Sequence, residues 1–312
     1  MKHLLQGTGV ALVTPFDSGG NIDYRALKTI LDHTVKGGAD YFVVMGTTGE
    51  PATLSPKEKH EVLDFVKKNN PASIPIVYGI GGNSTRGVLE EISNTNMDGV
   101  AAILSVSPYY NKPSQAGIQN HYEALADDSP VPILLYNVPG RTASNISATT
   151  TLALARHPNI IGIKEAAGDF FQTMTIASEK PADFILISGD DLLMLPLLSI
   201  GGEGVISVLA NAYPGIFSSI LKFFGAGDHQ GAAEMAFRLL NLHTLMYEEG
   251  SPSGIKFVLS ELDLCEPNVR LPMSQISGAL KERQQSFCAI FRSPLEIMGN
   301  RQSSWSGIKS SQ

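Results

Sequence analysis

The sequence predicts a closed (β/α)8 barrel with a small C-terminal helical appendage. Three observations support this fold class: short apolar runs rich in Val and Ile alternate with longer polar-studded segments, eight such runs occur, and the composition stays even along the chain. Near-continuous apolar runs are typical of parallel strands that are buried on both faces and joined by right-handed crossovers. A doubly wound open sheet is the alternative fold.

The eight apolar runs are the expected strands, in chain order. Each is short, and the segments between them are long enough to hold a crossover helix. The runs cover residues 10–16, 41–45, 74–78, 100–106, 131–136, 160–163, 184–187 and 204–208.

Two of the intervening helices are marked by specific signals. Residues 22–36 repeat apolar side chains at helical spacing. Residues 55–68 open with Ser55-Pro56-Lys57-Glu58, in which Ser55 is an N-cap, Pro56 occupies the first helical position and Glu58 completes a capping box.

The chain beyond the eighth run contains more helix than the barrel needs. The predicted organisation is a barrel over residues 1–225, a helical appendage over residues 226–284 and an atypical, poorly ordered tail over residues 285–312, where Ser and Gln accumulate and the pattern fades. The helical segments expected after the eighth run cover residues 215–224, 229–248, 253–262 and 274–283.

Composition narrows the class of protein. Of the 312 residues, 43% are hydrophobic and 17% charged, which is a globular composition, and the net charge of −7 leaves no basic surface for nucleic acid or anionic membranes. Two cysteines, Cys265 and Cys288, do not make a disulfide framework. The N-terminus shows no secretion signal, and no apolar run reaches the roughly 18 residues of a membrane span. We therefore expect a cytoplasmic protein.

In a (β/α)8 barrel, active sites lie at the carboxyl ends of the strands. The residues that follow the runs include hydroxyl side chains, tyrosines, one arginine and one lysine, which this geometry brings to one mouth. The segments concerned are Gly46-Thr47-Thr48-Gly49-Glu50, Ser107-Pro108-Tyr109-Tyr110-Asn111, Tyr136-Asn137-Val138-Pro139-Gly140-Arg141-Thr142, Lys164-Glu165, Ser188-Gly189-Asp190-Asp191 and Ile206 to Asn211.

Lys164 closes the apolar sixth run and is the candidate nucleophile. An amine must be neutral to attack a carbonyl, and burial that lowers a lysine pKa by about 3 units corresponds to roughly 4 kcal/mol. We expect a Schiff base between Lys164 and an α-keto acid. The alternative is a salt bridge to Glu165, although side chains alternate along a strand and these two should face opposite ways.

Four other side chains suggest supporting roles, each with a structural alternative. The phenol of Tyr136 can donate and accept a proton, or simply pack. Thr47 and Thr48 can bind a carboxylate, or cap the turn that follows the strand. Arg141 can bind a second acidic substrate bidentately, or lie on the surface.

Three further features do not support a cofactor or metal site. Gly79-Ile80-Gly81-Gly82 lacks the spacing of a nucleotide-binding loop and is interpreted as a tight turn. The histidines lie away from the strand ends and form no HExxH motif, which disfavours a metal-dependent aldolase. Asp190-Asp191 could bind a cation, but capping of the next helix is favoured.

The motifs together resemble those of the dihydrodipicolinate synthase family, in the superfamily of pyruvate-dependent class I aldolases that also includes N-acetylneuraminate lyase. The resemblance covers about residues 4–284, in order and at family spacing. The matching segments are Gly9-Val10-Ala11-Leu12-Val13-Thr14-Pro15-Phe16, Gly46-Thr47-Thr48-Gly49-Glu50, Pro108-Tyr109-Tyr110-Asn111-Lys112-Pro113, Tyr136-Asn137-Val138-Pro139-Gly140-Arg141-Thr142, Gly162-Ile163-Lys164-Glu165, Ser188-Gly189-Asp190-Asp191, Gly204-Val205-Ile206-Ser207-Val208 and Arg270-Leu271-Pro272-Met273.

The resemblance implies a role for each residue around the keto acid. Lys164 would form the Schiff base with pyruvate, and Tyr136 would donate and accept protons. Thr48 would bind the pyruvate carboxylate, the backbone near Ile206 would help to hold pyruvate, and Gly189 would line the pocket.

The resemblance also implies a second substrate and an assembly. Thr47 and Tyr110 would complete a proton relay with Tyr136, and Tyr110 would come from a neighbouring subunit of a homotetramer built from tight dimers. Arg141 would bind the carboxylate of L-aspartate 4-semialdehyde, giving 4-hydroxy-tetrahydrodipicolinate for diaminopimelate and lysine synthesis. No metal or dissociable organic cofactor is implied.

Two other functions stay open. Another pyruvate-dependent lyase, acting on N-acetylneuraminate or a keto-deoxy-sugar acid, would share Lys164 and Tyr136, but such members typically lack the arginine at 141. A non-catalytic keto-acid-binding relative is the third hypothesis, and the intact set of site residues argues against it.

Members of the family that lysine inhibits carry a polar cluster at the dimer interface. Asn83 and Tyr109 match that cluster, whereas Pro56, Lys59 and Gly87 replace its two histidines and its glutamate. We therefore expect weak or absent inhibition by lysine.

Overall fold

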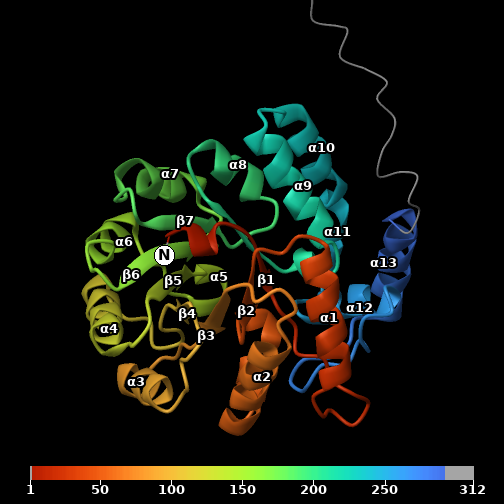
Figure 1. Ribbon diagram of the computed structural model, residues 1–312, viewed down its shortest axis with the longest axis horizontal. Coiled ribbons are helices and arrows are strands. Elements are labelled where there is room, and N and C mark those ends of the chain that lie inside the picture. The colour runs from red at the N-terminus through yellow and green to blue at the C-terminus, as the bar shows by residue number, and fades with distance from the viewer. Residues whose placement is uncertain (1, 292–312) are drawn as a thin grey trace, which may run out of the picture.

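Eight parallel strands close into a barrel in the computed structural model, which describes residues 2–291 (Figure 1). Each strand pairs with its sequence neighbours, and the ring closes between the first strand and the eighth. The predicted (β/α)8 barrel is confirmed. The strands are β1 Gly7–Ala11, β2 Tyr41–Val44, β3 Ile76–Gly79, β4 Ala102–Val106, β5 Ile133–Asn137, β6 Ile160–Glu165, β7 Ile185–Ser188 and β8 Gly204–Ser207.

The first strand lies earlier in the chain than the predicted run of residues 10–16. Strand β1 is bonded on both edges, and its register places Gly7 opposite Gly204 of β8 and Gly9 opposite Tyr41 of β2. The Leu12 N–H still donates to the Val43 carbonyl of β2 at 3.0 Å, and the chain leaves the sheet at Val13, whose backbone N–H donates to the side chain of Asn211 at 3.2 Å. The run was apolar because its later part is buried in the core, and not because it is strand.

Helices surround the barrel, as the crossovers require. The capping box that opens α2 is present, with the Ser55 hydroxyl accepting from the Glu58 N–H and the Glu58 carboxylate accepting from the Ser55 N–H. Helix α1 begins at Tyr24 because the Asp23 carboxylate caps it. The helices are α1 Tyr24–Lys36, α2 Pro56–Asn69, α3 Thr85–Ser93, α4 Gln115–Asp128, α5 Pro139–Thr142, α6 Ala148–Leu154, α7 Phe170–Glu179, α8 Met194–Ser199 and α9 Pro214–Gly225.

Alternation along the strands divides the buried side chains into two clusters. In β5, Ile133 and Leu135 belong to the cluster that packs against the helices, whereas Leu134 and Tyr136 belong to a separate cluster inside the barrel. In β6, Ile163 belongs to the outer cluster, so the next side chain points into the barrel.

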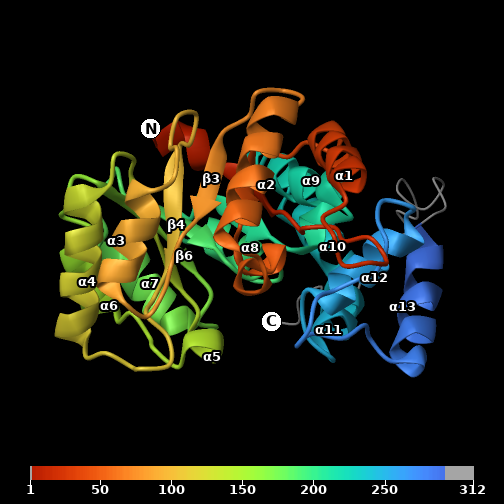
Figure 2. The same cartoon turned by 90° about the horizontal axis from the view of Figure 1, so that it is seen from below.

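Up to residue 291, four more helices follow the barrel: α10 His229–Arg238, α11 Leu240–Tyr247, α12 Ser253–Glu261 and α13 Gly278–Phe291. The predicted helix over residues 229–248 is interrupted at Leu239. Figures 1 and 2 show α11, α12 and α13 together on the side of the barrel next to α1 and away from α3 and α4. Within residues 2–291, no helix combines the length and the apolar character that a membrane crossing would require.

The predicted change to an irregular tail at Gln285 is wrong for residues 285–291, because α13 continues through them to Phe291. Packing holds this helix: Cys288 is buried, and the Gln284 amide donates to the Leu245 carbonyl at 3.1 Å. The rest of the predicted tail, residues 292–312, lies outside the described residues.

The close approach of β1 and β8 that closes the barrel can be tested by a substitution at Gly204. A Cβ atom there would lie 2.0 Å from the carbonyl oxygen of Gly7, and the backbone φ of +152° is unfavourable for other residues. We expect Gly204→Ala to lower the free energy of unfolding by about 1–3 kcal/mol, as other overpacked sites do, measured by urea denaturation. Gly215→Ala is the control, because its Cβ would have 3.9 Å to the nearest atom. Equal stability of both variants would contradict the closure argument.

Candidate active site

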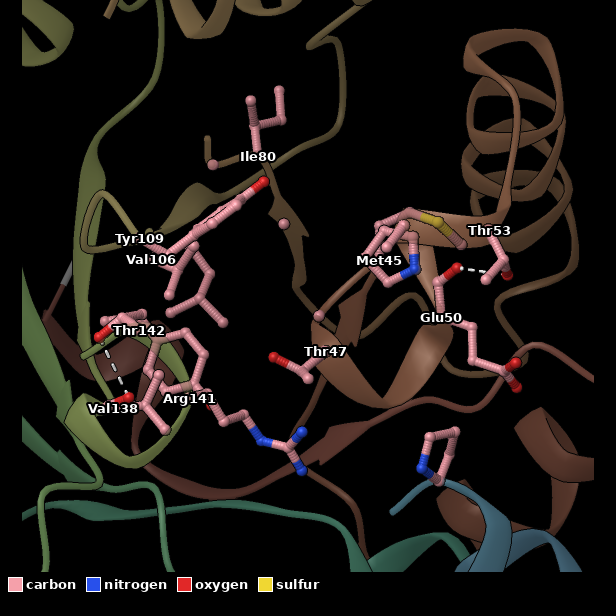
Figure 3. Close-up of a pocket in the computed structure, with 18 of the residues that line it drawn as sticks. Met45, Thr47, Glu50, Thr53, Ile80, Val106, Tyr109, Val138, Arg141 and Thr142 are labelled. Carbon is pink, nitrogen blue, oxygen red and sulfur yellow. Dashed lines mark hydrogen bonds between the residues drawn. The ribbon is translucent and has the colours of Figure 1, made fainter. Parts of the chain in front are cut away.

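A cavity of about 450 Å³ opens at the carboxyl ends of β2 to β5 (Figure 3). Thr47, Tyr136 and Arg141 line it from the barrel side. Pro252 and Met273, from the segments on either side of α12, complete its wall. The cavity therefore belongs jointly to the barrel mouth and to the C-terminal helices.

Lys164 and Tyr136 are neighbours in the barrel interior. The register of β5 and β6 places them side by side, and the Lys164 Nζ lies 4.3 Å from the centre of the Tyr136 ring. Both side chains are 5% exposed. Within the described part of the chain, no carboxylate forms an ion pair with this amine, which rests instead against an aromatic face.

Glu165 faces the opposite way and is fully engaged elsewhere, so the alternative of a Lys164–Glu165 salt bridge is excluded. Its carboxylate accepts from the Asn137 amide at 3.0 and 3.1 Å, from the Ala167 N–H at 2.7 Å and from the Gln172 amide at 3.2 Å. Burial raises the pKa of Glu165, and these hydrogen bonds oppose the shift. The network braces the ends of β5 and β6, where Tyr136 and Lys164 lie.

Thr47 and Thr48 lie on a 3-10 turn, Thr47–Gly49, directly after β2. Thr47 is exposed to the cavity, and Thr48 is buried. The alternative role of capping is not observed, because the residue that caps the turn is Gly46, which makes no side-chain bond. The hydroxyl of Thr14 holds the turn from below by donating to the Gly49 carbonyl at 2.7 Å.

Arg141 lies on the short helix α5, and Figure 3 shows its guanidinium extended into the cavity. It forms no ion pair within residues 2–291, so the group is available to an anion. The loop that carries it is fixed by Thr142, whose hydroxyl donates to the carbonyls of Val138 at 3.2 Å and Ser144 at 2.8 Å.

The remaining predicted site residues are Ile206, Gly189 and Tyr110. Ile206 is fully buried in the interior cluster, and Gly189 lies beside Lys164, because a Cβ there would be 3.0 Å from the Lys164 Cε. Tyr110 is not brought to this cavity: it is 86% exposed, with a positive φ of 74°. Its neighbour Tyr109 lines the cavity instead.

Asp190 and Asp191 each accept a backbone N–H, from Leu192 at 2.9 Å and from Leu209 at 3.0 Å. Neither carboxylate caps helix α8, so the predicted capping role is wrong. The two carboxylates bind backbone N–H groups instead. The sequence also did not place a histidine near the strand ends, yet α11 brings His243 to 3.6 Å from Asp190.

Three residues near the site, Glu50, Lys256 and Arg270, received no role from the sequence, although Glu50 and Arg270 stand in the quoted motifs. Lys256 is fully buried and paired with Glu50, and Arg270 is bonded to Glu58. A lysine inside the apolar stretch Gly254-Ile255-Lys256-Phe257-Val258-Leu259 is the signal that could have found the first pair.

Comparisons with known proteins identify relatives. The model of the dihydrodipicolinate synthetase family matches residues 4–291. A 4-hydroxy-tetrahydrodipicolinate synthase of Cytophaga hutchinsonii is 47% identical over 278 residues, which cover 89% of this chain and 94% of that protein.

Solved structures are similar over almost the same span. The 4-hydroxy-tetrahydrodipicolinate synthase of Methylacidiphilum fumariolicum SolV has a TM-score of 0.89 and 34% identity, covering 94% of this chain and 98% of that one. A monomeric dihydrodipicolinate synthase variant has a TM-score of 0.89 and 31% identity, with coverage of 92% and 97%.

Proposed function

The chain belongs to the dihydrodipicolinate synthetase family, and from that premise we propose that it condenses pyruvate with L-aspartate 4-semialdehyde to 4-hydroxy-tetrahydrodipicolinate. The product would supply diaminopimelate and lysine synthesis. The observation that supports this most strongly is the buried amine of Lys164 against the ring of Tyr136, a residue that lines the same cavity as Arg141.

The first half of the reaction makes a nucleophile from pyruvate. The neutral Lys164 amine attacks the keto carbon, the carbinolamine loses water, and an iminium forms. Tyr136, whose ring lies beside the Lys164 amine, would move protons to and from the carbinolamine oxygen. The iminium then loses a proton from the methyl group and becomes an enamine.

The second half builds the ring. The enamine carbon attacks the aldehyde carbon of the semialdehyde, whose oxygen takes up a proton. The amino group of the same substrate then attacks the iminium carbon and displaces Lys164 as a free amine. One water molecule leaves in the whole sequence, and the enzyme returns to its starting state.

Positions around Lys164 fit the two substrates. We assign the pyruvate carboxylate to Thr48, the backbone near Ile206 to holding pyruvate, and Gly189 to leaving room beside the lysine. Arg141 lies beyond Tyr136 on the chain that leaves β5, and a guanidinium there suits the carboxylate of the semialdehyde.

Assembly is part of the proposal. Thr47 lines the cavity with Tyr136, while Tyr110 projects outward, so we propose that Tyr110 completes the proton relay in a neighbouring copy. The proposed assembly is a homotetramer of tight dimers, working in the cytoplasm. The existence of a monomeric structural relative makes the oligomeric state of this chain a necessary measurement.

Covalent trapping tests the central step. We expect borohydride reduction in the presence of pyruvate to attach a pyruvate-derived group to Lys164 and to abolish activity, measured by peptide mass mapping. Lys164→Arg should give no adduct, because a guanidinium does not form the iminium. The buried Lys256 serves as the internal control. An adduct on Lys256, or none at Lys164, would refute the mechanism.

Arg141 is expected to select the second substrate. Because a hydrogen bond to a charged group contributes about 1.5–3 kcal/mol, Arg141→Met should raise the KM for the semialdehyde roughly 10- to 150-fold. Trapping of pyruvate on Lys164 should not change. In parallel assays, cleavage of N-acetylneuraminate by the unaltered protein at a comparable kcat/KM would favour the sialate lyase hypothesis instead.

We expect weak or absent inhibition by lysine, because of the residues that line the cavity near Tyr109. Lys59 forms an ion pair with Glu91 at 3.1 Å, and both line the cavity beside Tyr109. An incoming ammonium group would meet an acid already neutralised by Lys59, and Gly87 offers no second carboxylate. A coupled assay with L-lysine tests this, and strong inhibition at sub-millimolar lysine would overturn it.

A further inference from the structure

A buried ion pair joins the C-terminal helices to the barrel mouth. Lys256 of α12 is 0% exposed, and its Nζ lies 2.5 Å from the Glu50 Oε1, 2.8 Å from the Asn268 carbonyl oxygen and 4.0 Å from the centre of the Phe16 ring. Burial lowers the pKa of Lys256, and Glu50 opposes the shift. An amine in such a place stays charged only while its partner is held close.

Glu50 follows the turn that carries Thr47 and Thr48. Its backbone has a positive φ of 55°, a region that non-glycine residues seldom adopt. The N–H of Glu50 donates to the Thr47 carbonyl at 3.2 Å, and its carbonyl accepts from the N–H and hydroxyl of Thr53 at 3.0 and 3.1 Å. Figure 3 shows its carboxylate directed away from Thr47 and Arg141.

Both oxygens of that carboxylate are held by the C-terminal segment. Lys256 lies at one, and the backbone N–H of Arg270 donates to the other at 3.2 Å. The Arg270 guanidinium in turn bonds Glu58 at 2.6 Å and the Thr53 carbonyl at 3.0 Å. The hydrogen bond from Arg270 is the main reason that the pKa of Glu58 falls to about 2.

The same contacts place part of the cavity wall. Pro272 and Met273 line the cavity and are separated from Arg270 only by Leu271, so the anchoring of Arg270 sets where they lie. These contacts thus position the Thr47–Gly49 turn on one side of the cavity and Pro272 and Met273 on another.

Stability alone does not explain the pair. Replacing a buried ion pair by uncharged residues of similar size is often neutral for stability or better, because two charges no longer lose their hydration. The pair does, however, define a position, since one oxygen of Glu50 lies in the ion pair with Lys256 and the other accepts from the Arg270 N–H.

We propose that Glu50 and Lys256 are positioning residues for the reaction, through which the C-terminal helices hold the Thr47–Gly49 turn in its working geometry. This inference rests on the proposed function, because it assigns its effect to the pyruvate-binding side of that site. Neither residue touches the reacting atoms.

Three variants test the proposal. Lys256→Met leaves the buried Glu50 carboxylate without its charged partner. The double variant Glu50→Gln with Lys256→Met removes both charges at similar volume. Glu50→Asp keeps the charge pair but draws the carboxylate back by one methylene, and Asp tolerates a positive φ.

Lys180→Met is the matched control, because it breaks a second largely buried ion pair, Lys180 with Glu203 at 3.2 Å, that precedes β7 and β8 at the end of the barrel opposite the cavity.

The readouts are Tm, kcat, the KM for pyruvate and the rate of borohydride trapping at Lys164. We expect Lys256→Met to have a lower Tm and a lower activity than the unaltered protein. The double variant should regain Tm while kcat stays about 10- to 100-fold low, trapping stays slow and the KM for pyruvate stays raised, because small displacements at a reacting site have effects of this size. Lys180→Met should have a lower Tm but the same kinetic constants as the unaltered protein.

Recovery of kcat together with Tm in the double variant would overturn the proposal, since the pair would then serve stability alone. If the charge-removing variants give no folded protein, Glu50→Asp decides: a lowered kcat at parental Tm supports the proposal, and parental kinetics refute it. Failure of the unaltered protein to trap pyruvate at Lys164 would instead refute the proposed function, independently of these variants.

Discussion

Closure of the barrel between β1 and β8 is the constraint on which the rest of the structure depends. It requires Gly7 and Gly204 to approach so closely that no side chain fits at Gly204, and it completes the ring of eight strands. Because the strands are parallel, their carboxyl ends then meet at one mouth. The cavity, the threonine turn and the lysine near the end of β6 lie at the same end of the barrel for that reason.

The two buried lysines, Lys256 and Lys164, have different surroundings, which suit their amines to different roles. Lys256 has an acid, a carbonyl and an aromatic ring around it, so its charge is satisfied and its amine is enclosed. Lys164 has a tyrosine ring beside it, and its acidic sequence neighbour Glu165 is turned outward into an amide network. The first arrangement suits a structural anchor, and the second suits a nucleophile.

The helices beyond the barrel are part of the site. They supply Pro252 and Met273 to the cavity wall, and through Lys256 and Arg270 they reach the loop after β2. A barrel that ended at α9 would keep Lys164 and Tyr136 but would lose one wall and the brace of the threonine turn.

The sequence by itself determined the barrel class, the capping box at Ser55 and the position of Lys164 on an inward-facing strand position, because these signals are periodic or lie within a few residues. It misplaced the start of β1 and could not find the Glu50–Lys256 pair. Those features depend on contacts between segments far apart in the chain, and only closure of the barrel and docking of α12 bring such segments together.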